Sequence, residues 1–288
     1  MKNSQKLAEL SAQRKAVIVP GAPNAMFARL IEDLGFEVVY VTGAGVANMH
    51  LGTPDIGLTT LTEVAAAVAG IADAVDLPII VDGDTGFGNP LNVIRTVRVL
   101  ERSGAAGIQI EDQVFPKRCG HFEGKAIVAR NEMIQKIHAA VDARHDQHLQ
   151  IIARTDALAV EGIEAALERA QAYIEAGADM TFVEAPRSRD ELARIPRELR
   201  VPQVANIVYG GKTPDLGRDV LTECGFSLVL YANAALQAAL RASREVLESL
   251  QNTGSLATVG DRLAEFEERQ AVVKKSDWDD LEARYKTE

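Results

Sequence analysis

The residues best suited to chemistry lie in one stretch, 110–125, with the sequence IEDQVFPKRCGHFEGK. Two cations and a histidine flank its cysteine, Cys119, in the sequence: Lys117, Arg118 and His121. Nearby positive charges lower the pKa of a thiol and favour the thiolate. Gly120 lets the backbone approach a ligand closely. We therefore predict a loop that transfers a proton to a bound anion, although this stretch alone equally fits a surface loop whose cysteine is incidental.

Two acids separated by one glycine, Asp82 and Asp84, form the candidate metal site. No cluster of histidines or cysteines accompanies them, and carboxylate oxygens alone favour Mg²⁺ or Mn²⁺ over zinc. Mg²⁺ keeps several waters and needs only one or two carboxylates from a protein. Asp55 and Glu111 are expected to hold those waters. Taken in isolation, Asp-Gly-Asp is also the sequence of an ordinary turn.

Short apolar runs alternate with helical stretches along the whole chain. The runs cover residues 16–20, 37–41, 77–81, 106–110, 150–153, 179–183, 201–205 and 226–230. Helical spacing of apolar residues follows several of them, most clearly in 61–75. Strands alternating with helices imply a parallel sheet, and eight such units predict a closed α/β barrel of the (β/α)8 TIM type. An open doubly wound sheet is the alternative.

Polar residues recur at the ends of these apolar runs. They are Tyr40, Thr42, Asp82, Asp84, Glu111, Arg154, Asp156, Glu184 and Asn206. In a closed barrel the chemistry sits at the C-terminal ends of the strands. We therefore expect these side chains to converge on one mouth of the barrel, rather than to be scattered loop charges.

The composition excludes several classes of function. The chain has 31 Lys and Arg against 41 Asp and Glu, a net charge of −10, so nothing indicates binding to nucleic acid or an anionic membrane. Cys119 and Cys224 stand in unrelated contexts, which argues against a disulfide framework and fits a cytoplasmic location. The first residues lack the apolar core of a signal peptide, and no apolar run is long enough to span a membrane.

The end of the chain is expected to form a unit of its own. Residues 1–250 are predicted to make the barrel domain, and 251–288 a helical extension. The extension is charged, yet it carries large apolar side chains: Leu263, Phe266, Val272, Val273, Trp278, Leu281 and Tyr285. Such side chains favour docking on the barrel or on a second subunit over a frayed terminus.

Several of these motifs together resemble a known family. The run DGDTGFG at 82–88, the run EDQ at 111–113, KRCGH at 117–121 and IARTDA at 152–157 are similar to the isocitrate lyase/phosphoenolpyruvate mutase superfamily. The resemblance covers about residues 16–245. It implies a (β/α)8 barrel, dependence on Mg²⁺ and a homotetramer in which C-terminal helices are exchanged between subunits. Cys119 places the chain with the carbon–carbon lyases, which include the 2,3-dimethylmalate and 2-methylisocitrate lyases.

The resemblance also implies a role for each matching residue. Asp82 and Asp84 would hold Mg²⁺, with Asp55 and Glu111 acting through waters. The pyruvoyl carboxylate would be wrapped by Thr42, Gly43 and Ala44. Arg154 would contact the substrate near its reacting hydroxyl, and the pocket would be completed by Gly120, His121, Glu184 and Asn206. Cys119 would protonate the departing enolate, which Arg118 and His121 would stabilise; Tyr40, Arg154 or a water on the metal remain candidates for the base.

Two positions depart from the pattern of the methylisocitrate lyases. Val208 replaces a hydroxyl residue, and Gln237 replaces an arginine. Each change removes a partner for an extra carboxylate, and an unpaired buried carboxylate is costly. We therefore expect an alkylated 2-hydroxy dicarboxylate as substrate, although Arg187 or Lys212 could supply the missing cation. Hydrolysis of oxaloacetate and, less favoured, phosphonate chemistry are the alternatives.

Overall fold

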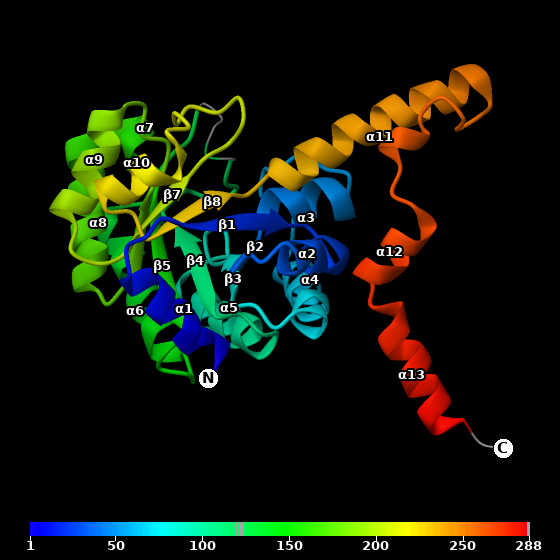
Figure 1. The fold of residues 1–288 in the computed structure, drawn as a ribbon. Helices are drawn as coiled ribbons and strands as arrows, with labels where there is room; N and C mark the ends of the chain where they lie inside the picture. Colours follow the sequence, from blue (N-terminus) through cyan, green and yellow to red (C-terminus); the bar gives the residue numbers. More distant parts are fainter. Residues whose placement is uncertain (119, 121–123, 287–288) are drawn as a thin grey trace.

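The chain folds around a closed barrel of eight parallel strands, as predicted (Figure 1). The computed structural model describes residues 1–118, 120 and 124–286. Each strand pairs with the next one in the sequence, and β8 pairs with β1. The strands are β1 Val17–Ala22, β2 Val39–Val41, β3 Ile79–Asp82, β4 Gly107–Glu111, β5 Gln150–Thr155, β6 Met180–Val183, β7 Gln203–Asn206 and β8 Leu228–Tyr231.

Helices pack around the outside of this barrel, and several of them begin at a residue whose side chain caps the helix. The Thr60 hydroxyl accepts a hydrogen bond from the Glu63 N–H, and the Glu63 carboxylate accepts one from the Thr60 N–H, so α4 starts with a capping box. The barrel helices are α1 Asn3–Ala12, α2 Ala25–Asp33, α3 Gly43–His50, α4 Leu61–Ala74, α5 Pro90–Arg102, α6 Arg130–Ala143, α7 Ala157–Glu161, α8 Ile163–Glu175, α9 Arg189–Glu198 and α10 Gly217–Cys224.

The sequence patterns did not indicate two of these helices, α3 and α7. Helix α3 contains Gly43 and Gly45, and glycine disfavours helix by about 1 kcal/mol relative to alanine. The Thr42 hydroxyl nevertheless caps it by accepting from the Gly45 N–H at 3.3 Å. A Cβ at Gly45 would lie 2.5 Å from the capping Thr42 side chain and 3.2 Å from the Pro23 side chain, so packing requires the glycine that propensity disfavours.

Two apolar layers hold the barrel together. One lies between the strands and the surrounding helices, where Val68, Ile108 and Ile137 are fully buried. The other fills the barrel interior and includes Ile80 and Phe182. The Leu7 side chain of α1 belongs to the interior layer, and a Cβ at Gly107, at the start of β4, would lie 2.9 Å from it. Helix α1 therefore covers the end where the strands begin and leaves the other end for a site.

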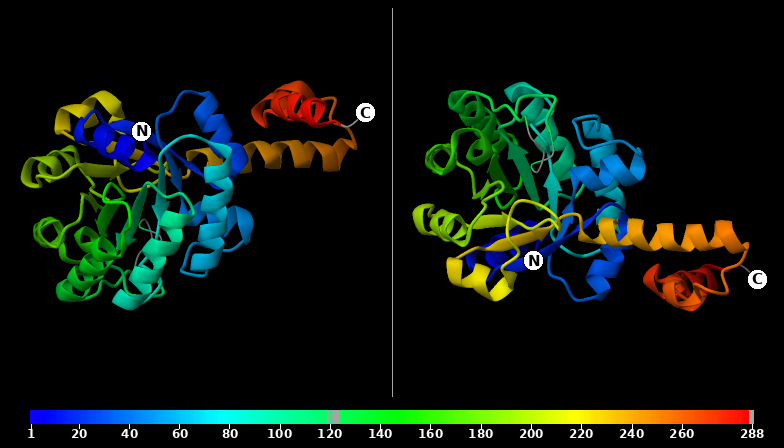
Figure 2. Two further views of the ribbon diagram at one scale, coloured as in Figure 1. Left: turned by 90° about the horizontal axis from the view of Figure 1, so that it is seen from below. Right: turned by 90° about the horizontal axis from the view of Figure 1, so that it is seen from above.

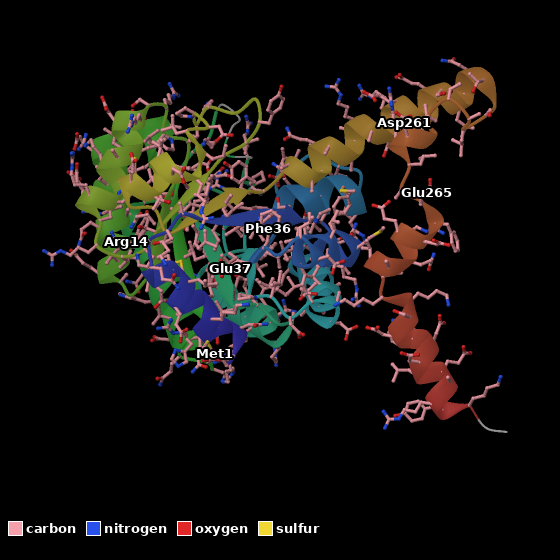
Figure 3. All side chains as sticks on the ribbon, in the orientation of Figure 1. Met1, Arg14, Phe36, Glu37, Asp261 and Glu265 are labelled. Atoms are coloured by element: carbon pink, nitrogen blue, oxygen red, sulfur yellow. The ribbon has the colours of Figure 1, made fainter. Side chains whose placement is uncertain are left out.

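The C-terminal part of the chain projects away from the barrel (Figures 1 and 2). Helix α11, Ala234–Thr253, has no buried residue in the described chain and is followed by η1 Gly260–Arg262, α12 Phe266–Val272 and α13 Lys275–Tyr285. Figure 3 places Asp261 and Glu265 on this projecting part, away from Phe36 and Glu37 of the barrel. The predicted helical extension is present, and none of the described helices is long and apolar enough to cross a membrane.

The tail makes only a small contact with the barrel of its own chain. Helix α12 lies beside α2, and Lys274 forms an ion pair with Glu32 at 3.3 Å. Phe266, Trp278 and Tyr285 remain 67%, 65% and 71% exposed. The apolar residues of the extension are therefore largely uncovered within one chain, so docking on a second subunit stays a prediction.

Closure of the barrel depends on a glycine in β1. A Cβ added at Gly21 would lie 1.9 Å from the backbone oxygen of Ala232, just past β8. We expect Gly21→Ala to lower the free energy of unfolding by about 3 kcal/mol, because a rigid backbone group must move. Gly70→Ala in α4 is the control: nothing lies within 4 Å, and alanine should stabilise that helix slightly. Urea unfolding of both variants measures the difference; equal stability would contradict this packing argument.

Candidate active site

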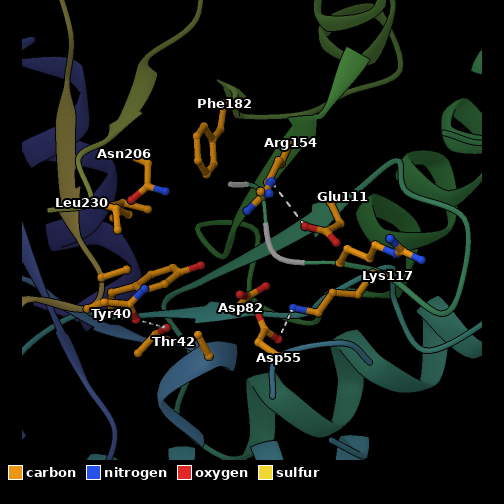
Figure 4. A pocket seen from close by; sticks show the side chains of 16 residues that line it. Tyr40, Thr42, Asp55, Asp82, Glu111, Lys117, Arg154, Phe182, Asn206 and Leu230 are labelled. Carbon is orange, nitrogen blue, oxygen red and sulfur yellow. Dashed lines mark hydrogen bonds and ion pairs between the residues drawn. The ribbon is translucent and has the colours of Figure 1, made fainter. Parts of the chain in front are cut away.

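A pocket lies where the strands end, lined by residues from all parts of the barrel (Figure 4). Ten of the residues singled out in the sequence line it: Tyr40, Thr42, Ala44, Asp55, Asp82, Glu111, Arg118, Gly120, Arg154 and Asn206. Three others lie directly behind this lining. Gly43 donates its N–H to Asp82 at 3.4 Å, Asp84 pairs with Lys117, and Glu184 faces Arg154. The expected convergence on one mouth is thus observed for the described residues of that set, except that Asp156 lies behind Arg154 and outside the lining.

A buried lysine lies among the carboxylates of the candidate metal site. The Lys117 Nζ is 2.6 Å from Asp55 Oδ1 and 2.8 Å from Asp84 Oδ1, and its side chain is 4% exposed. The sequence suggested that Lys117 would act on Cys119, which lies outside the described residues; among those described, the charge of Lys117 faces the acids. Burial lowers the pKa of Lys117, but Asp84 and the other carboxylates outweigh this effect and raise it, so the ammonium stays charged.

The two aspartates of the Asp-Gly-Asp motif, Asp82 and Asp84, both lie close to the backbone of Gly43. A Cβ at Gly43 would lie 3.0 Å from Asp82 Oδ2 and 3.3 Å from Asp84 Oδ1. Burial raises the pKa of Asp84 to about 7, against the opposing effect of Lys117. Among the described residues, no three Asp, Glu, His or Cys side chains are grouped as a complete cage for a metal. Two carboxylates with room for waters and substrate nevertheless fit Mg²⁺ or Mn²⁺, which need few protein ligands.

Arg154 is the central cation on the opposite side of the pocket. Its Nε lies 3.2 Å from Glu111 Oε2 and 3.0 Å from Asp156 Oδ2, and its Nη1 lies 3.6 Å from Glu184 Oε2. The guanidinium also lies over the Phe182 ring at 5.2 Å. Burial opposes its charge, but the surrounding acids raise the pKa of Arg154 further above its ordinary value. A fixed, fully charged guanidinium is suited to bind a carboxylate or a developing oxyanion.

Tyr40 is connected to the metal-site acids through Gln109. The Tyr40 hydroxyl donates to Gln109 Oε1 at 3.2 Å, and Gln109 Nε2 donates to Asp82 Oδ1 at 3.5 Å. Burial, followed by the charge of Asp82, raises the pKa of Tyr40 well above its ordinary value. Tyr40 and Arg154 therefore both retain their protons in this arrangement, and neither is ready to accept another group's proton.

Two buried oxygens at the pocket have no hydrogen-bond partner among the described residues. They are Glu111 Oε1 and Asn206 Oδ1. Burying a polar atom without a partner costs about 1–3 kcal/mol. Groups of this kind at a pocket indicate a polar ligand.

The stretch around the cysteine is described only in part. Arg118 and Gly120 line the pocket, and a Cβ at Gly120 would lie 2.5 Å from Arg154 Nη2, so the glycine predicted for close approach does approach closely. Gln113 accepts from the Arg118 N–H at 2.9 Å and donates to the Arg118 backbone oxygen at 2.8 Å. Cys119 and His121 lie outside the described residues, and their predicted roles remain predictions.

The sequence patterns missed the apolar wall of the pocket. Phe182, Leu230 and Ala232 line it together with Asn233, and Val208, noted as a departure, also faces it. Because strand side chains alternate between the barrel interior and the helices, the apolar types at these positions gave no sign of which ones face the ligand. Gln237, the second departure, is partly buried and donates to the Tyr209 backbone oxygen at 3.3 Å, outside the lining.

Comparison with known proteins identifies the family. The model of the phosphoenolpyruvate phosphomutase family matches residues 7–251. The chain belongs to the isocitrate lyase/phosphoenolpyruvate mutase superfamily. It is 43% identical over 287 residues to 2,3-dimethylmalate lyase of Eubacterium barkeri, covering 100% of this chain and 99% of that protein. It is 47% identical over 257 residues to 2-methylisocitrate lyase of Aeropyrum pernix, covering 89% and 82%.

Solved structures of this superfamily have the same fold. An oxaloacetate acetylhydrolase in complex with 3,3-difluorooxalacetate is 33% identical with a TM-score of 0.93, covering 98% of this chain and 96% of that one. A phosphonopyruvate hydrolase complex with oxalate and Mg²⁺ is 30% identical with a TM-score of 0.88, covering 99% of each chain. The family resemblance and the enzyme class inferred from the sequence, a carbon–carbon lyase of this superfamily, are confirmed.

Proposed function

We propose that the protein is an Mg²⁺-dependent lyase that cleaves an alkylated 2-hydroxy dicarboxylate into pyruvate and a second carboxylate. The observation that carries the proposal is the pocket itself. Its acidic side contains Asp82 and Asp55, the cation Arg154 faces it, and Val208, Phe182 and Leu230 form an apolar wall. A relative that matches the full length of the chain, the 2,3-dimethylmalate lyase, supports a substrate of this class.

Each part of the pocket has a task in this reaction. A bound Mg²⁺ would be held by Asp82 and Asp84 and would polarise the substrate's hydroxyl and neighbouring carboxylate. Thr42 and Ala44 line the pocket at the start of α3, and the N-terminus of this helix suits the pyruvoyl carboxylate. Arg154 holds the substrate near the bond that breaks.

The bond between C2 and C3 breaks when the 2-hydroxyl loses its proton to a base. The electrons of that bond form an enolate on the departing carboxylate, and C2 becomes the carbonyl carbon of pyruvate. Arg118 stabilises the enolate as a cation in the pocket, and Cys119 gives its thiol proton to C3. His121 is assigned to the same task from the sequence.

Hydrolysis of oxaloacetate is the second candidate function. The similarity to an oxaloacetate acetylhydrolase at a TM-score of 0.93 favours this hydrolysis as the alternative, because the same fold supports it in that enzyme. Phosphonate chemistry is less favoured, since Cys119 indicates carbon–carbon cleavage.

A substrate panel separates these functions. The purified protein is incubated with Mg²⁺ and 2,3-dimethylmalate, 2-methylisocitrate, citramalate or oxaloacetate, and pyruvate and oxalate are measured. Pyruvate from 2,3-dimethylmalate, lost after chelation by EDTA and restored by Mg²⁺ or Mn²⁺, is the expected result. Oxalate from oxaloacetate, without pyruvate from any substrate, would favour the hydrolase. A protein that neither converts any substrate nor binds the metal would contradict both proposed functions.

Val208 is expected to select for an alkyl group. We predict that Val208→Thr lowers kcat/KM for 2,3-dimethylmalate roughly tenfold, because a hydroxyl then faces a methyl group, and raises the relative rate for 2-methylisocitrate. Val160→Thr is the matched control, since Val160 lies on α7 and is 46% exposed. An unchanged ratio of kcat/KM between the two substrates would contradict the assignment.

The exposed tail is proposed to complete a homotetramer. Leu240 and Leu247 on α11 are 58% and 62% exposed, and Phe266 of α12 and Trp278 of α13 are 67% and 65% exposed. Exchange of these helices between subunits would bury them, and the solution mass tests this proposal.

A further inference from the structure

Lys125, just past the cysteine-bearing stretch, is a buried cation with two specific partners. Its side chain is 2% exposed. Its Nζ donates to the backbone oxygen of Gly120 at 2.6 Å and to Asp156 Oδ1 at 2.7 Å. Gly120 lines the pocket, whereas Lys125 and Asp156 do not belong to the lining. Lys125 therefore acts on the pocket only through the groups that it holds.

Asp156 is shared between Lys125 and the pocket arginine. Its Oδ2 accepts from Arg154 Nε at 3.0 Å, and its Oδ1 accepts from Arg154 Nη2 at 3.2 Å. The Asp156 N–H donates to Asp112 Oδ1 at 2.9 Å, and the Asp156 side chain is 0% exposed. The carboxylate is thus fixed from its backbone, and its two oxygens fix the plane of the guanidinium.

We propose that Lys125 is a positioning residue that fastens the Gly120 backbone to the same carboxylate that orients Arg154. The proposal rests on the proposed function, because it concerns how that pocket is assembled. It gives the pocket arginine and the neighbouring loop backbone one common anchor. A shift of either one would change the distance between Arg154, the cation proposed to bind the substrate, and the residues of the KRCGH run.

The balance of charges explains why a lysine is needed here. Three acids face Arg154: Glu111, Asp156 and Glu184. Lys125 adds a second cation to this cluster, with its Nζ 2.7 Å from Asp156 Oδ1. Burial works to raise the pKa of Asp156, but Arg154 and Lys125 outweigh it and lower the pKa, so the carboxylate stays ionised.

The loop backbone is held at a second point by a neutral group. Gln113 bonds both backbone groups of Arg118, while Lys125 holds Gly120. The tight approach of Gly120 to Arg154 leaves no space for a side chain between them. Gln113 alone cannot fix this approach, since it makes no described contact with Arg154 or Asp156.

The test compares Lys125→Met with a control of the same chemistry at the other end of the barrel. Arg144 donates to Asp179 Oδ2 at 2.7 Å and to the backbone oxygen of Leu149 at 2.9 Å, beside the start of β5. Steady-state kinetics give kcat and KM, and amide hydrogen exchange is followed in peptides covering residues 113–120. The exchange readout does not depend on the substrate.

K125M is expected to lower kcat about 100-fold with a smaller change in KM, because the reacting groups are misplaced while binding remains. Exchange over 113–120 should become faster, and Lys125→Arg should recover at least a tenth of the wild-type kcat. Arg144→Met should lose stability but keep kcat and the exchange rates of 113–120.

Wild-type kcat and unchanged exchange in K125M would overturn the proposal, as would equal losses of kcat in K125M and R144M. If K125M does not fold, Lys125→Gln takes its place with the same expectations. If the wild-type protein converts none of the substrates, the proposed function fails, and the exchange of 113–120 still decides whether Lys125 holds the loop.

Discussion

Replacing Arg154 by lysine is expected to lower kcat/KM by about 1,000-fold, a loss typical of removing a preorganised donor. The guanidinium pairs at once with Glu111, Asp156 and Glu184 and lies over Phe182. A lysine keeps the charge but has no planar fork, so it cannot hold this geometry. Steady-state kinetics on 2,3-dimethylmalate, or on whichever panel substrate is converted, measure the loss.

Arg194→Lys is the matched control for this variant. Arg194 lies on α9 and also pairs with two acids, Glu164 at 2.8 Å and Glu198 at 2.8 Å, but on the surface. Exposed pairs of this kind contribute about 0–1 kcal/mol, so activity and stability should both stay near the wild type. An Arg154→Lys variant that retains most of the wild-type kcat/KM would show that the pocket does not need a planar guanidinium at this position.

Replacing Cys119 by serine is expected to abolish cleavage, with a loss of more than about 1,000-fold in kcat, while Mg²⁺ binding persists. A serine hydroxyl is a far weaker acid than a thiol, so it cannot supply the proton that C3 requires. Asp82 and Asp84, assigned to the metal, are unchanged in this variant. Calorimetric titration with Mg²⁺ and product assays separate the two effects.

The second cysteine of the chain provides the control. Cys224 ends α10, is half-buried, and has a pKa raised by burial. Such a thiol is unreactive, so Cys224→Ser should leave kcat unchanged. A fully active Cys119→Ser variant would remove thiol protonation from the mechanism, and loss of Mg²⁺ binding would indicate a structural role instead.

The sequence sufficed to predict the barrel because its strands are short, apolar and evenly alternated with helices. β4 and β5 are buried at every position, and both were found from short runs rich in Ile and Ala. The polar residues that end the strands, such as Glu111 and Asn206, were also predictable, because parallel strands bring their carboxyl ends to one side. Helix α3 was missed because its glycines serve packing rather than helix propensity.

The family motifs likewise depend on sequence alone, since DGDTGFG and KRCGH occupy consecutive positions. The direction in which a side chain points cannot be read from the local sequence in this way. Lys117 stands two residues from Cys119 in the sequence, yet its ammonium lies between Asp55 and Asp84. Residues 55, 84 and 117 are far apart in the chain, and only the closed barrel brings their charges together.

The same distinction applies to the substrate side of the pocket. The sequence by itself determined the superfamily, the barrel and the set of acids and cations, because these follow from local patterns. Only the tertiary structure decided that Phe182, Leu230 and Ala232 join Val208 in one apolar wall, and that Lys125 reaches Asp156 behind Arg154. Contacts between residues distant in the chain are fixed by the packing of strands and helices, which no short pattern records.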